Sequence, residues 1–293
     1  MKPAPFEYIR PADIDEVCAH LAADDGARLI AGGQTLVPLM AMRLARPPRL
    51  IDIARVPGLA FVRDEGSAVV IGATTRQCVV ESDPLVHAKL PLLAEVMPYV
   101  GHTATRARGT VGGSLANGDP AAEIVLVAIT LGATLIYRDG PATREIQADQ
   151  FLIGPMVTAL APTTCLVAVR FPVWTGKRLG VGFHEINARK SDFAFASAAA
   201  QIELDDAGVC RKLAVGIGAV AAVPVRLETV SHALEGSRVD ENRTREAVET
   251  ALAGIEPMSD LHASPNYRRR VAATLAVRAI MDADAAARKS HAR

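Results

Sequence analysis

Cysteine is scarce in this sequence, with four residues in a chain of 293. They stand far apart, and no two of them form a CxxC or CxxxC spacing. This distribution is typical of reduced, buried thiols rather than of a disulfide framework or a zinc site. Because one iron–sulfur cluster generally needs four cysteine ligands brought together, the spacing also argues against a cluster in this chain, and we predict no metal site. The four residues are Cys18, Cys78, Cys165 and Cys210.

An excess of charge of one sign and a long apolar run are missing as well. Lys plus Arg and Asp plus Glu both number 32, so the chain lacks the net basic character of a nucleic-acid or membrane-surface binder. The longest apolar stretch, 124–136, is shorter than the roughly 18 residues of a membrane span. The N-terminus has no apolar core of a signal peptide. We therefore expect a cytoplasmic globular protein that binds neither nucleic acid nor membrane.

Common catalytic and nucleotide motifs are also absent. The sequence has no GxxxxGK[ST] loop, no HExxH and no G-x-S-x-G, which leaves P-loop, metalloenzyme and hydrolase functions without support. The segment 216–221, GIGAVA, fits the G-x-G-x-x-A spacing of a dinucleotide site. Pro224 prevents a helix of useful length from following it, so we interpret the segment as a core strand and turn. We name no catalytic residue.

The first part of the chain alternates between short helical and strand-like segments. Residues 11–24 carry the apolar stripe of an amphipathic helix, with Asp13 as the N-cap. Strands are expected at 28–31 and 49–53, with a glycine pair and a short helix between them. A strand pair turned at 64–67 opens the next region.

The middle and the last third of the chain contain further predicted helices and strands. Residues 101–120 are too polar for a core and too rich in small side chains for an ordinary helix. Asp119 and Pro120 are expected to open a helix that ends near Gly132. Two strand-like runs and three helical patterns follow, at 196–204, 210–220, 226–235, 243–253 and 267–287. Since strands and helices do not alternate regularly, we predict an α+β fold rather than a doubly wound sheet.

Two glycine pairs stand out from this background. AGGQT at 31–35 follows a strand directly, and TVGGS at 110–114 lies just upstream of the predicted helix start. Paired glycines remove Cβ atoms where backbone must lie against something, and nearby hydroxyl and amide groups can donate hydrogen bonds to phosphate or ribose oxygens. Each loop alone is compatible with an ordinary turn. Two such loops from separate subdomains could clamp one long anionic ligand.

The order of several segments resembles a known family. AGGQTLVPLMAMRLARPPRLIDI, VVIGATT, RARGTVGGSLANGDPAAE and GFHEINARKSDFAFASAAA follow one another at these separations. Together they resemble the FAD-binding medium subunit of the molybdenum hydroxylases, the family of carbon monoxide dehydrogenase and xanthine dehydrogenase, over essentially the whole chain. The resemblance implies a two-subdomain FAD-binding domain of the vanillyl-alcohol-oxidase (PCMH) type and a C-terminal α+β domain with a small antiparallel sheet and helices. The implied boundaries are 1–56, 57–173 and 174–293.

The resemblance also implies which residues hold FAD. The first loop is expected to wrap the pyrophosphate with backbone amides, and the second loop to do the same from the other side. The first loop consists of Leu29, Ile30, Ala31, Gly32, Gly33, Gln34, Thr35 and Leu36, and the second of Thr110, Val111, Gly112, Gly113 and Ser114. Further contacts are expected at Val100, Asn117, Asp119, Glu123, Leu166, His184, Asp192 and Phe193. His184 stands where xanthine dehydrogenases have a lysine.

The implied function is that of an electron-transfer subunit. A large subunit with a molybdenum cofactor would oxidise the substrate, and a small subunit with two [2Fe–2S] clusters would pass electrons to FAD in this chain, within a dimer of heterotrimers. FAD suits this position because it accepts single electrons and releases a pair. Two other functions stay open from the sequence: a self-sufficient flavin oxidase, and an assembly module that has kept the fold without the cofactor. The sequence identifies neither the substrate nor the terminal acceptor.

Overall fold

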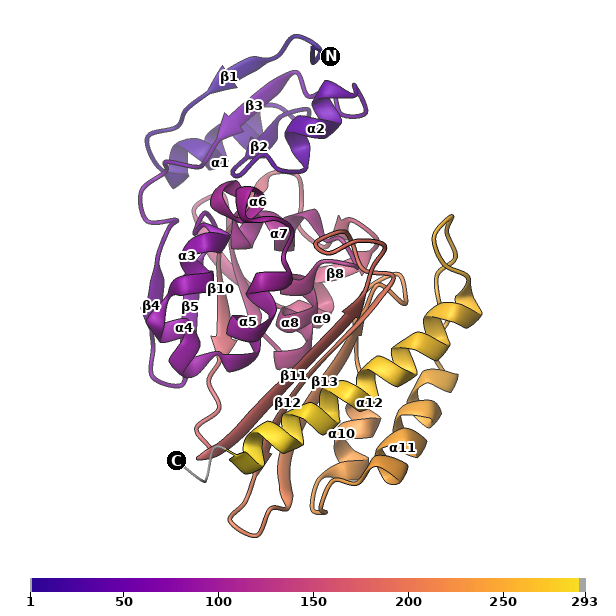
Figure 1. The fold of residues 1–293 in the computed structure, drawn as a ribbon. Coiled ribbons are helices and arrows are strands. Elements are labelled where there is room, and N and C mark those ends of the chain that lie inside the picture. The colour runs from indigo at the N-terminus through magenta and orange to yellow at the C-terminus, as the bar shows by residue number, and fades with distance from the viewer. Residues whose placement is uncertain (1, 290–293) are drawn as a thin grey trace.

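The computed structural model describes residues 2–289 and builds them around three sheets stacked along the molecule (Figure 1). The first sheet is parallel, with strand order β1-β3-β2. Helix α1 begins after Asp13, whose side chain accepts a hydrogen bond from the Glu16 N–H at 2.9 Å, so the predicted N-cap is confirmed. The elements are β1 (Glu7–Ile9), α1 (Ile14–Ala23), β2 (Arg28–Ile30), α2 (Leu36–Ala41) and β3 (Arg49–Asp52).

The second sheet is antiparallel, with the order β4-β5-β10-β6-β7, and its helices cover one face. Helix α8 is buried along its whole length and forms the centre of the largest core. The strands are β4 (Val62–Asp64), β5 (Ala68–Gly72), β6 (Thr134–Asp139), β7 (Ala142–Gln147) and β10 (Thr164–Pro172), with the hairpin β8 (Leu152–Gly154) and β9 (Val157–Thr158). The helices are α3 (Gln77–Ser82), α4 (Pro84–Lys89), α5 (Pro91–Val96), the 3-10 turn η1 (Met97–Tyr99), α6 (Thr103–Arg108), α7 (Val111–Asn117), α8 (Glu123–Leu131) and α9 (Ala148–Phe151).

The third sheet is antiparallel, in the order β11-β12-β13-β14. The long helix α12 runs across one of its faces, and α10 and α11 lie beside it (Figure 1). The opposite face packs against α5 and α8 of the second region. The elements are β11 (Arg178–Ile186), β12 (Ala196–Leu204), β13 (Cys210–Gly218), β14 (Val225–Arg226), α10 (Glu228–Leu234), α11 (Glu241–Ala253) and α12 (Pro265–Lys289).

The structure confirms the α+β class and corrects two local predictions. Residues 101–120, expected to avoid ordinary helix, contain α6 and α7. The helix expected to open at Asp119 begins at Glu123, because the Pro120 carbonyl accepts from the Ala219 N–H at 2.7 Å instead of from a helix N–H. The segment 216–221 begins inside β13, in agreement with the strand-and-turn interpretation. The predicted boundaries after 56 and 173 fall between the sheets, and residues 1 and 290–293 of the predicted domains lie outside the described part.

Two buried threonines allow a paired test of this packing. Both are fully buried, but the Thr244 hydroxyl donates to the Asp240 carbonyl at 2.7 Å, whereas the Thr130 hydroxyl in α8 has no hydrogen-bond partner among the described residues. Replacing an unpartnered buried hydroxyl by a methyl group removes a desolvation cost. We expect Thr130→Val to raise the free energy of unfolding by about 1 kcal/mol and Thr244→Val to lower it by a similar amount, measured by urea denaturation. A loss of stability in Thr130→Val would contradict the assigned packing.

Candidate functional site

The first glycine loop, 31–35, joins the end of β2 to α2 and lies directly on the second region. A Cβ atom on Gly32 would lie 2.4 Å from the Arg108 carbonyl oxygen and 2.9 Å from the Gly109 Cα atom. Gly33 has a φ of 71°, a left-handed conformation that favours glycine. The first loop therefore packs directly against the segment that leads into the second loop, and backbone atoms on both sides make this contact.

This loop presents backbone amides that the protein leaves unused. In the part of the chain that the structure describes, the N–H groups of residues 32–35 donate to no protein acceptor. Gly33 is left-handed and Thr35 is right-handed helical, with φ −101° and ψ −49°. Successive N–H groups in such mixed-handed backbone form a concave anion-binding nest. We call residues 32–35 the amide nest; it has the form needed to bind a phosphate oxygen.

The second glycine loop differs from the first in its hydrogen bonds. The amides of Val111, Gly112 and Ser114 donate to backbone carbonyls, and the Gly113 amide donates to the Thr110 hydroxyl at 3.0 Å. These four N–H groups thus have acceptors within the protein; contact of Thr110–Ser114 with FAD stays a prediction. A Cβ atom on Gly112 would lie 2.5–2.7 Å from Ala73 atoms, so this glycine allows α7 to pack on the end of β5.

A group of carboxyls lies between α8 and β11. Asp119 and Glu123 are each 8% exposed, and Glu123 is the first residue of α8. Burial, with a smaller contribution from the Glu185 and Asp119 carboxyls, raises the pKa of Glu123 to about 8. Burial likewise raises the pKa of Asp119 and raises that of Glu185 to about 7. We call Asp119, Glu123 and Glu185 the interdomain carboxyl group.

Strand β11 presents alternate side chains to the two sides of its sheet. The His184 ring lies on the α12 side, where its Nε2 is 2.8 Å from the Asp282 carboxylate. Phe183 and Glu185 point the other way, and the Phe183 ring packs edge-on against Tyr99 with 4.8 Å between the ring centroids. The side chain of His184, predicted to contact the flavin, therefore lies on the face away from α8. Glu185 was missed, although strand alternation after the buried Phe183 would have placed it.

The remaining predicted contacts lie on elements and loops of the second and third regions. Leu166 is buried in β10 at a register shift against β6, and the buried Val100 accepts a hydrogen bond from Arg106 Nη1 at 3.2 Å. Asn117 ends α7. In the loop after β11, Asp192 accepts a hydrogen bond from Arg189 Nε at 2.9 Å, and Phe193 is 68% exposed. That these residues contact FAD stays a prediction.

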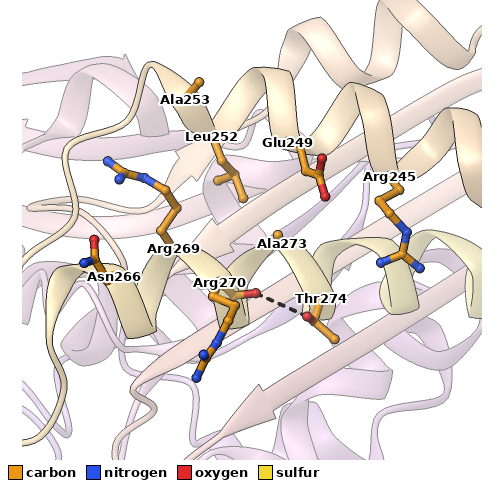
Figure 2. A pocket seen from close by; sticks show the side chains of 9 residues that line it. All are labelled: Arg245, Glu249, Leu252, Ala253, Asn266, Arg269, Arg270, Ala273 and Thr274. Atoms are coloured by element: carbon orange, nitrogen blue, oxygen red, sulfur yellow. Dashed lines mark hydrogen bonds between the residues drawn. The ribbon is translucent and has the colours of Figure 1, made fainter.

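A separate groove lies away from the predicted FAD residues. A groove of about 750 Å³ runs between α11 and α12, and Figure 2 shows Arg245, Arg269 and Arg270 around it. None of the predicted FAD residues lines this groove. A smaller apolar cavity of about 310 Å³ is lined by Ile30 and Val37, which flank the first loop. Among residues 2–289, no cluster of three or more His, Cys, Asp or Glu side chains has the arrangement of a metal site.

Comparison with known proteins shows which families the chain matches and which proteins are similar to it. Residues 4–174 match the family described as the FAD binding domain in molybdopterin dehydrogenase, and residues 182–283 match the CO dehydrogenase flavoprotein C-terminal domain. The chain is 34% identical over 285 residues to 6-hydroxypseudooxynicotine dehydrogenase complex subunit alpha of Paenarthrobacter nicotinovorans, covering 97% of this chain and 96% of that protein. It is 33% identical over 290 residues to the carbon monoxide dehydrogenase medium chain of Afipia carboxidovorans, with 98% and 100% covered.

Solved structures agree with these relatives. The chain is similar to a chain of carbon monoxide dehydrogenase from Hydrogenophaga pseudoflava, with a TM-score of 0.93, 33% identity, and 98% of this chain and 99% of that chain covered. It is also similar to a chain of quinoline 2-oxidoreductase from Pseudomonas putida 86, with a TM-score of 0.92, 36% identity, and the same shares covered.

The packing of Gly112 on β5 gives a stability prediction. Gly112→Ala adds a Cβ atom against Ala73 and should lower the free energy of unfolding by about 1–3 kcal/mol, because backbone on both sides must shift. Gly254→Ala is the matched control, since the nearest atom to its Cβ would be 4.0 Å away. Urea denaturation of both variants measures the difference. Equal stability of the two variants would contradict the close approach of α7 to β5.

The raised pKa of Glu123 gives a pH prediction. Below about pH 4.5 the carboxyl is protonated in the folded and unfolded states; between about 4.5 and 8 only the folded state keeps the proton. The free energy of unfolding should therefore fall as pH rises through this window, with a slope approaching ~1.4 kcal/mol per pH unit. Glu123→Gln should remove this contribution, and the exposed Glu246→Gln should not. Denaturation of the FAD-free protein at several pH values tests this; an unchanged slope in Glu123→Gln contradicts it.

Proposed function

Because the chain belongs to the family of FAD-binding subunits of molybdopterin dehydrogenases, we propose that the amide nest binds the FAD pyrophosphate. The observation that carries this proposal is the row of four N–H groups at residues 32–35, which have no acceptor among residues 2–289 and include the left-handed Gly33. A dianionic pyrophosphate supplies the acceptors that these donors lack. The other predicted contacts, from Val100 to Phe193, belong to this proposal as the groups that surround the rest of the cofactor.

When bound, FAD supplies one-electron acceptance and two-electron release. The chain itself would bind and orient the cofactor and leave a path by which the electron acceptor reaches the flavin. The exposed Phe193 lies on the loop after β11, where the resemblance expects the reactive edge of the flavin. We therefore propose that this loop borders the path to the electron acceptor. No acid–base step is assigned to any residue.

The chain works within a multi-subunit oxidoreductase, since the relatives are named as medium chains or subunits of complexes. We propose the finer arrangement implied by the resemblance: a large subunit with the molybdenum cofactor, a small subunit with two [2Fe–2S] clusters, and a dimer of such heterotrimers. Three of the four free cysteines are buried, which supports clusters held by a partner rather than by this chain.

The substrate is proposed to be set by the partner subunit. Relatives at 31–34% identity carry the names nicotine 6-hydroxylase, carbon monoxide dehydrogenase and caffeine dehydrogenase, so similar medium chains serve different substrates. That these relatives are subunits does not favour a self-sufficient flavin oxidase. The intact amide nest does not favour a cofactor-free assembly module.

Two further points stay predictions. The three-part division at 56/57 and 173/174 follows the three sheets, and a cytoplasmic location follows from the sequence composition. Among residues 2–289, no helix combines the length and apolar character of a membrane span.

The nest is tested with a matched pair of glycine substitutions. Gly33→Val forces a β-branched residue into a left-handed conformation and should distort the nest, so the purified protein should bind FAD at least about tenfold more weakly while staying folded. Gly236→Val carries the same strain, with φ 76° and open space around the added atoms, but lies in the third region. It should keep wild-type affinity.

The measurement is the flavin-to-protein absorbance ratio together with a titration of FAD into the FAD-free protein, with circular dichroism as the check on folding. Full FAD occupancy in a folded Gly33→Val protein would overturn the nest proposal. Failure of the wild-type protein to bind FAD under any condition would overturn the proposed function itself.

A further inference from the structure

The groove between α11 and α12 combines an apolar base with basic edges (Figure 2). Leu252 is buried, and with the small side chains of Ala253 and Ala273 it forms the apolar part of the lining. The exposed Arg245 and Arg270 line the same groove from α11 and α12. We call this feature the arginine groove. Its volume of about 750 Å³ leaves room for several side chains of another molecule.

The positive charge of the arginine groove is not neutralised from within it. Arg245, Arg269 and Arg270 line the groove, and Glu249 is the one acidic residue in the lining. The Glu249 carboxylate forms no ion pair or hydrogen bond with another residue in the range 2–289. The groove therefore carries an excess of positive charge, although the chain as a whole has none.

Each of these arginines keeps N–H donors for an outside acceptor. The exposed Arg270 guanidinium has neither a hydrogen bond nor an ion pair within the described part of the chain. Arg269 Nη2 donates to the Ile255 carbonyl at 3.0 Å, which fixes that guanidinium beside the end of α11. Arg245 Nη2 lies 2.6 Å from Glu241 Oε1. This is an exposed pair one turn apart, a kind that contributes little, and a guanidinium has five N–H donors.

The positive charges are spread along the groove rather than gathered at one point. Helix α11 lines it with residues 245, 249, 252 and 253, a single stripe at helical spacing. Residues eight apart on a helix are separated by about 12 Å along its axis. Figure 2 shows Arg245 toward one end of the groove and Arg269 toward the other. A compact anion would meet only one end, whereas an acidic protein segment can meet both.

We propose that the arginine groove is the docking site for an acidic segment of a partner subunit. Carboxylates of this segment pair with the arginines at the two ends of the groove, and its apolar side chains lie on Leu252 and Ala273. The proposal rests on the assembly with partner subunits proposed above and does not depend on FAD binding. Guanidinium and carboxylate groups match in a bidentate geometry, and charges at the edge of an interface fix its register.

Glu249 adds a requirement on the sequence of this segment. It lies midway between residues 245 and 253 on α11 and would repel a carboxylate placed opposite it. The segment therefore has acidic residues toward both ends and none at its centre. Removing the Glu249 charge should strengthen docking, an effect that damage to the fold would not produce.

The test measures the affinity of this chain for the purified assembly of the other subunits of its own complex. Arg270→Glu reverses a charge that holds no other described side chain, and it should weaken association by about tenfold or more. Glu249→Gln should strengthen association by about two- to threefold. Arg278→Glu is the matched control: Arg278 is an exposed arginine of α12 outside the groove, without a side-chain partner among residues 2–289. It should stay within about twofold of the wild type, and circular dichroism checks the folding of all three variants.

Photo-crosslinking identifies the occupant in the assembled complex. Thr274 is exposed and lines the groove, so Thr274→p-benzoylphenylalanine places a reactive group there. Mass spectrometry should find it joined to a partner-subunit segment with at least two acidic residues that flank apolar ones. The same experiment in the Arg270→Glu background should give much less of this product.

Several results would overturn the proposal while leaving the assembly intact. In one, folded Arg270→Glu and Glu249→Gln both associate as the wild type does. In another, Glu249→Gln weakens association. In a third, the crosslink forms to a second copy of this chain, to a partner segment without acidic residues, or to no protein. A wild-type chain that does not associate with the other subunits at all is a different result, which contradicts the proposed assembly itself.

Discussion

The contact between Gly32 and the Arg108 carbonyl is the constraint on which the candidate site depends. The loop after β2 and the end of α6 meet there, backbone to backbone, without a side chain between them. The segment that Gly32 touches is itself fixed, because the Arg76 guanidinium donates to the same Arg108 carbonyl and the Gln77 N–H donates to the Gly109 carbonyl at 3.0 Å. The amide nest is therefore held against a rigid support rather than at the tip of a free loop, which is the condition for presenting several donors to one anion.

A second set of bonds fixes the third region against the same site. Arg268 of α12 is 2% exposed, and its Nη1 donates to the carbonyls of Phe195 and Ala219, each at 2.6 Å. Its charge is paired with Asp260 at 2.5 Å. The Ala219 N–H in turn donates to the Pro120 carbonyl at 2.7 Å, just before α8. One buried guanidinium thus joins the loop that carries Phe193 to the turn that leads to Glu123.

These tertiary bonds explain which predictions from the sequence hold. Local signals were sufficient for α1, where Asp13 caps a clear apolar stripe, and for β12, whose observed bounds 196–204 equal the predicted ones. The start of α8 was predicted three to four residues too early. Asp119 and Pro120 are valid helix-start residues, but the Pro120 carbonyl is bonded across the molecule to Ala219 and is not available to a helix. That partner is a hundred residues away in sequence, so no local pattern reveals it.

The expectation that 110–114 avoid ordinary helix was wrong for a related reason. Low helix propensity argued against ordinary helix at 110–114, and paired glycines indicated contact with a ligand. In the structure Thr110 caps α7, and Gly112 faces Ala73 instead of an open site. Paired glycines in a sequence indicate that something comes close to the backbone, but they do not distinguish a ligand from another part of the chain. The first loop is distinguished by its unpaired amides, a property that only the hydrogen-bond pattern provides.

The positions of the backbone N–H donors and of the carboxyls also bear on how a bound cofactor would be oriented. The amide nest lies in the first region, and the interdomain carboxyl group lies between the second and third. Two like charges about 5 Å apart repel by roughly 3 kcal/mol at an effective dielectric constant of about 20. A pyrophosphate placed beside Asp119, Glu123 and Glu185 would meet this repulsion, or would require all three carboxyls to be protonated. A pyrophosphate at the nest avoids both. The chain has no net charge to attract an anion from a distance, so in the proposed function the local order of amides and carboxyls would orient the cofactor.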